Sequence, residues 1–124
     1  ATTIAGDPAS VLVPARLITE APFASTDVMA ADGGLLDMPG SYYTSDRFAN
    51  AEYIKNVEQP FLWIHGTADD FLSIKTHGEV VYKNYEGVYG QAERVVGAGH
   101  SNVPQTIGFV EYNKLLESFI TKKI

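Results

Sequence analysis

The sequence has no cysteine, which excludes disulfides, thiolate nucleophiles and cysteine-bound metals and leaves the redox compartment undetermined. Basic residues are also scarce: nine Lys and Arg stand against fifteen Asp and Glu, for a formal net charge of -6. Nucleic acids and anionic membranes are bound through clusters of Lys and Arg, so we expect neither as a partner. No apolar run approaches the ~20 residues of a membrane span. The 124 residues, 45% of them hydrophobic, suit one globular domain.

The first residues also lack the features of a natural start. There is no initiator Met, no basic segment and no signal-like apolar stretch. "ATTIAGDP" instead resembles the end of a helix, with small residues, then Gly6, then Pro8. We therefore expect the natural polypeptide to begin well upstream of Ala1. A processed secreted protein is the alternative.

Short apolar stretches alternate with helix-like stretches along the chain. Strands are expected at 15–19, 60–65 and 92–97. Helices are expected at 25–31, 50–57, 75–86 and 106–121. The stretch "PFLWIH" is nearly all apolar, as is typical of a parallel strand buried on both faces. The alternation predicts an α/β fold with parallel strands.

Three parallel strands by themselves would form an incomplete sheet. Both outer strands would present unpaired backbone edges, and part of the sheet would lack cover. This agrees with the expectation that the sheet is incomplete without an N-terminal part.

Ionisable residues follow two neighbouring predicted strands. Asp69 and Asp70 come after the strand at 60–65, and His100 comes after the strand at 92–97, 31 positions after Asp69. Active sites of open α/β sheets lie beyond the carboxyl ends of their strands, where both loops should open. We expect an acid of the first loop to orient His100 and to stabilise its imidazolium. His100 would act as general base and then as general acid.

The other ionisable residues have simpler interpretations. Asp70 is expected to be a solvated neighbour or a helix-start acid, and His65 a structural histidine that shapes the loop. His77 is expected to face solvent, and Glu20 to be a capping or solvated residue that could also tune the site. No pair of histidines has helical metal-binding spacing, so we expect no metal.

Two groups of apolar residues lie outside the predicted strands. The first could line an acyl or leaving-group pocket or simply pack beneath an irregular loop: Phe23, Met29, Leu35, Leu36, Met38, Tyr42 and Tyr43. The second lies on one face of the helix expected at 106–121 and should belong to the core: Phe109, Tyr112, Leu115, Leu116, Phe119 and Ile120.

Taken together, several segments resemble the C-terminal half of an α/β-hydrolase. "PFLWIHGTADDFLSI" followed by "ERVVGAGHSN" is similar to that family's strand, His-Gly-x-x-Asp, strand and Gly-x-Gly-His. "LITEAPFAS" resembles the strand and loop after the nucleophile helix, and "RFANAEYIKNVEQPFLWIHGTADD" resembles the connection in members without a large cap domain. The resemblance implies that Asp69 is the triad acid and His100 the triad base. Residues 1–124 would then be one part of a single domain, with a short cap-like connection at about 24–57.

The sequence departs from the family at the nucleophile. The family carries its serine in Gly-x-Ser-x-Gly, ahead of the other two triad residues. No such motif occurs here. The nearest stretch, "GHSNV" at 99–103, lacks the second Gly and follows Asp69. By resemblance, the serine should lie about one or two helical turns upstream of Ala1.

The resemblance therefore implies part of a serine hydrolase that cleaves esters, thioesters or amides through an acyl-enzyme and needs no cofactor. The chain alone should be inactive, and its partners should be a small acyl substrate and the N-terminal segment of the same protein. The alternative is a non-catalytic module that keeps the fold and binds a ligand. A redox or response-regulator-like domain is disfavoured, because the sequence has no cysteine and no early acidic cluster.

Overall fold

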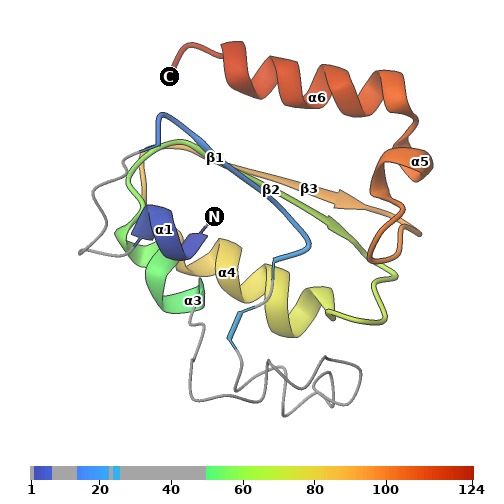
Figure 1. Ribbon diagram of the computed structural model, residues 1–124, viewed down its shortest axis with the longest axis horizontal. Helices are drawn as coiled ribbons and strands as arrows, with labels where there is room; N and C mark the ends of the chain where they lie inside the picture. Colours follow the sequence, from blue (N-terminus) through green and yellow to red (C-terminus); the bar gives the residue numbers. More distant parts are fainter. Residues whose placement is uncertain (1, 7–13, 23, 26–49) are drawn as a thin grey trace.

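The computed structural model describes residues 2–6, 14–22, 24–25 and 50–124. In this part of the chain, three strands form one sheet with helices on both faces (Figure 1). The elements in chain order are α1 (Thr2–Gly6), β1 (Leu17–Glu20), α3 (Asn50–Tyr53), the 3₁₀ helix η3 (Ile54–Asn56), β2 (Phe61–Gly66), the π-helix η4 (Ile74–Gly78), α4 (Glu79–Asn84), β3 (Gly90–Val95), α5 (Val103–Ile107) and α6 (Phe109–Thr121).

Some predictions fall outside the described residues. These are the helix expected at 25–31, most of the cap-like connection at 24–57, and the apolar residues expected to line a pocket or pack beneath it.

The three predicted strands are confirmed, and they run parallel in the order β1-β2-β3. β3 begins two residues earlier than expected. Gly90 lies opposite Phe61 in the register, so backbone pairing with β2 extends the strand beyond its apolar stretch. The sheet is open, and the outer edge of β1 has no neighbouring strand among the described residues.

β2 separates two hydrophobic cores because its side chains alternate between the faces of the sheet. Phe61 and Trp63 pack with Ile54 and Val81 on the face covered by α1, α3 and α4. On the opposite face Leu62 and Ile64 belong to the cluster that contains Phe119 of α6. The apolar stretch in the sequence is therefore the part of the chain that is buried on both sides.

The C-terminal helical region differs from the prediction. The helix expected at 106–121 is two helices, α5 and α6, separated by Gly108. Gly108 has φ +97°, a backbone conformation that glycine adopts without the steric penalty of a side chain. Its N–H donates to the carbonyl of Pro104 at the end of α5. The expected core face is only partly correct. Phe119 is buried and Leu116 packs against its cluster, but Phe109 and Ile120 are 61% and 56% exposed.

The helix expected at 75–86 is also different, because it starts as the π-helix η4 and ends at Asn84. Tyr85 is extended, and its hydroxyl donates to the carbonyl of Gln59 at 2.6 Å. This tertiary bond favours an end of the helix at Asn84, three residues before Gly87, the expected stop signal.

The loops after β2 and β3 lie against each other at the carboxyl edge of the sheet. Thr67 N–H donates to the carbonyl of Val95 at 3.0 Å, and Ala68 N–H donates to that of Ala98 at 2.9 Å. Gly66 makes this approach possible, since a Cβ at that position would lie 2.2 Å from the Ala98 carbonyl oxygen. The obstructing atom belongs to the backbone and cannot rotate away.

We expect Gly66→Ala to lower the free energy of unfolding by about 1–3 kcal/mol or more, because the loops must separate to admit the methyl group. Gly99→Ala is the matched control, since its Cβ would meet its nearest neighbour, Asn102 Oδ1, at an ordinary 3.5 Å. Urea unfolding of the protein as encoded in its gene measures both. Equal midpoints for the two variants would contradict the steric argument.

Phe61→Ala is expected to cost about 3–5 kcal/mol, because Phe61 is completely buried and its removal leaves a cavity. Phe109→Ala makes the same chemical change at an exposed position and should cost about 0.5 kcal/mol or less. The same urea experiment tests this pair. A loss at Phe109 as large as that at Phe61 would mean that Phe109 is covered in the folded protein.

Candidate functional site

Asp69 lies in the loop after β2, and backbone donors hold its carboxylate. Its side chain is 0% exposed, so the carboxylate depends on hydrogen bonds for its stability. Oδ1 accepts N–H groups from Phe71 at 2.9 Å and from Leu72 at 2.7 Å. The Asp69 N–H donates to the Gly66 carbonyl at 3.3 Å. The loop folds around its own acid and leaves Oδ2 for other partners.

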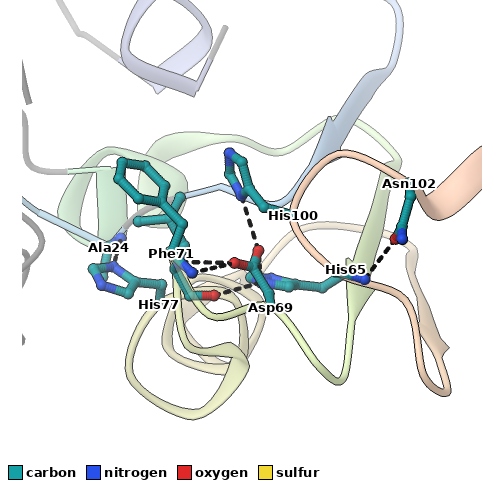
Figure 2. A network of polar contacts seen from close by, with 9 residues as sticks. Ala24, His65, Asp69, Phe71, His77, His100 and Asn102 are labelled. Carbon is teal, nitrogen blue, oxygen red and sulfur yellow. Dashed lines mark hydrogen bonds and ion pairs between the residues drawn. The ribbon is translucent and has the colours of Figure 1, made fainter. Parts of the chain in front are cut away.

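His100, in the loop between β3 and α5, contacts the second oxygen of this carboxylate (Figure 2). Its Nδ1 lies 2.9 Å from Asp69 Oδ2. An ionised carboxylate only accepts hydrogen bonds, so the proton of this contact belongs to Nδ1. Nε2 is then the nitrogen that can accept a proton, and the side chain is 40% exposed. The expected contact between the two residues is present, and their catalytic roles stay predictions.

Two neighbours support the imidazole of His100. The Phe71 ring meets it edge-on, with centroids 5.0 Å apart and planes at 63°. The Gly99 N–H donates to Asn102 Oδ1 at 2.6 Å, which braces the backbone beside the histidine. Phe71 also donates its N–H to Asp69. One loop therefore both holds the Asp69 carboxylate and packs against the His100 ring.

His65 is closer to the site than the sequence indicated. It was expected to shape the loop, and its Nε2 does lie 2.9 Å from the Leu72 carbonyl oxygen. The same nitrogen lies 3.1 Å from Asp69 Oδ2, a contact that the sequence analysis missed. The available signal was its position at the end of β2, four residues before Asp69.

The expectation that His77 faces solvent is wrong. Its side chain is buried, with the residue 1% exposed, and its Nδ1 accepts the N–H of Ala24 at 3.0 Å. The cause is tight packing of η4 on β2. A Cβ on Gly78, the next residue, would lie 2.1 Å from His65 Nδ1 and 2.6 Å from the Trp63 ring. This end of the helix faces the interior.

The two other acids considered in the sequence analysis, Asp70 and Glu20, lie outside this network. Asp70 is exposed, as expected. Glu20 is also exposed and accepts a hydrogen bond from the Tyr112 hydroxyl at 2.8 Å, which joins β1 to α6. Burial, together with the hydrogen bond to Glu20, raises the pKa of Tyr112 to about 12. The phenol therefore remains a donor at neutral pH.

The ranges that the structure describes contain no group of three or more His, Cys, Asp or Glu side chains able to hold a metal ion. Within the same ranges, no helix has the length and hydropathy needed to cross a bilayer.

Comparisons with known proteins show resemblance in structure alone. No family model matches the sequence, and no curated protein matches it. An esterase from Pyrococcus furiosus superposes on 97% of this chain with a TM-score of 0.69 at 13% identity. The esterase domain of a Rhodothermus marinus protein covers 95% with a TM-score of 0.63 at 12% identity. An acylaminoacyl peptidase covers 93% with a TM-score of 0.62 at 20% identity.

The chain spans 48%, 54% and 21% of the lengths of these three chains. They are α/β-hydrolases, and the open parallel sheet of this chain matches about half of the first two. This chain therefore has the α/β-hydrolase fold and corresponds to part of such a domain.

Proposed function

We propose that this chain supplies the acid and the base of a serine hydrolase that acts on a carboxylic ester, thioester or amide. The observation that carries the proposal is the contact between a buried carboxylate, Asp69, and a partly exposed imidazole, His100. It occurs at the carboxyl edge of a parallel sheet, where such folds gather functional groups. The hydrolytic names of the structural neighbours agree with it.

In the proposed mechanism, His100 Nε2 removes the proton of a serine hydroxyl as the oxygen attacks the acyl carbon. The resulting imidazolium then gives this proton to the leaving alcohol, thiol or amine. Asp69 retains its charge, holds the proton on Nδ1 and stabilises the imidazolium. In the second half, His100 activates a water molecule in the same way. The water oxygen attacks the acyl-enzyme, the carboxylic acid product is released and the serine hydroxyl is regenerated.

The nucleophile is proposed to lie upstream of Ala1, in the N-terminal segment of the same protein. The printed sequence has no Gly-x-Ser-x-Gly, and the nucleophile of such a fold opens a helix. α1 is helical at Thr2–Gly6, which suits the end of that helix. The outer edge of β1, which has no strand partner among the described residues, would pair with a strand of the same segment. Without that segment the chain would be inactive.

Asp69→Asn should lower kcat for p-nitrophenyl acetate by roughly 10³–10⁴-fold, because the amide cannot hold the correct tautomer of His100. His100→Ala should lose at least as much. Asp70→Asn is the matched control. It removes an adjacent but exposed carboxylate and should stay within about twofold of the unmodified protein. The assay uses the protein as encoded in its full gene.

A His100→Ala protein that keeps its activity would overturn the mechanism. An unmodified protein that hydrolyses no ester, and whose gene encodes no Ser, Cys or Asp at the expected elbow, would favour the ligand-binding module instead.

A further inference from the structure

His65 has an unusual place in the site, because one of its ring nitrogens faces two acceptors. Its Nε2 lies 3.1 Å from Asp69 Oδ2 and 2.9 Å from the carbonyl oxygen of Leu72. A carbonyl and an ionised carboxylate can only accept, so Nε2 carries the proton and shares it between them. His65 therefore donates to the same carboxylate oxygen that holds His100 (Figure 2).

The ring of His65 has little freedom to turn. Its side chain is 0% exposed, and the Trp63 ring meets it at 71° with centroids 5.9 Å apart. The backbone of η4 closes the other side, since a Cβ on Gly78 would lie 2.1 Å from His65 Nδ1. Nδ1 is buried and has no hydrogen-bond partner among the described residues. A proton there would be a buried donor without an acceptor, which favours the neutral Nε2–H tautomer.

A neutral donor suits the carboxylate of a catalytic pair. A buried cation beside Asp69 would compensate its charge and weaken its attraction for the imidazolium of His100. A neutral N–H orients the oxygen and lowers the cost of burying it without cancelling the charge. With Oδ1 held by the Phe71 and Leu72 amides and Oδ2 held by His65, the carboxylate cannot rotate away from His100.

We propose that His65 is a positioning residue for the reaction, in that it fixes Asp69 Oδ2 toward His100 from inside the fold. This inference rests on the proposed function. His65 also joins Asp69 to the Leu72 carbonyl, so that one proton both closes the loop and aligns the acid.

Two substitutions separate the hydrogen bond from the bulk of the side chain. His65→Leu removes the donor and keeps an apolar side chain of similar reach, whereas His65→Gln keeps an N–H donor at nearly the same distance from the backbone. We expect His65→Leu to lower kcat for p-nitrophenyl acetate on the order of 10–100-fold. Loss of a residue that orients a metal ligand has an effect of this size. KM should stay within about twofold. His65→Gln should retain most of the kcat that His65→Leu loses.

A double-mutant cycle with Asp69→Ala distinguishes positioning from general stability. If His65 acts through Asp69, His65→Leu should cost less than about twofold once Asp69 is already Ala. A loss of the same factor in both backgrounds overturns the proposal, because it means that His65 only stabilises the fold. Equal activity of the Leu variant and the unmodified protein overturns it as well, and so does a Gln variant no better than Leu.

The proposed function can be tested separately in the same set of variants. Activity that survives Asp69→Ala refutes the triad and the positioning role together. Loss of activity in Asp69→Ala with no effect of His65→Leu refutes the positioning role alone. If the His65→Leu variant does not fold, the ¹⁵N chemical shifts of His65 in the unmodified protein test the proposal, because they show which ring nitrogen carries the proton. The Nε2–H tautomer is expected, and an Nδ1–H tautomer overturns the proposal.

Discussion

The burial of one carboxylate, that of Asp69, governs the arrangement of both loops at the carboxyl edge of the sheet. A charge removed from water must find donors within the protein. Asp69 finds them in the amides of Phe71 and Leu72 and in the imidazoles of His65 and His100. The loop after β2 has to turn back on itself to supply the amides. The loop after β3 has to come close enough to supply His100.

That closeness depends on the sheet beneath. β2 and β3 are parallel neighbours in register from Phe61 and Gly90 to Gly66 and Val95, so their carboxyl ends meet at the same level. β2 is packed on both faces, which gives Asp69 and His65 a rigid base. Gly66 then lets the two loops touch through their backbones. The contact at 2.9 Å between Asp69 and His100 is thus a consequence of strand register, strand burial and the absence of a side chain at Gly66.

The outer edge of β1 has no strand partner among the described residues, and Phe109 and Ile120 of α6 are exposed. Only part of the apolar face of α6 is buried, namely the part that packs against the sheet. In this chain that is Phe119 with its near neighbours, above Leu62 and Ile64.

The sequence by itself determined the strands and their parallel direction, because burial on both faces leaves a local pattern. It also predicted that an acid of the first loop pairs with His100, and the resemblance to a known family selected Asp69. Those patterns carry no record of packing between distant segments. The break at Gly108, the burial of His77 against β2 and the hydrogen bond from His65 to Asp69 were decided only in the tertiary structure. The burial of His77 requires the close approach of η4 to β2, which no local spacing encodes. Gly108 and His65 leave a local signal, but that signal does not fix the backbone turn or the contacts of the ring. Only the tertiary structure shows that Asp69 contacts His65 as well as His100.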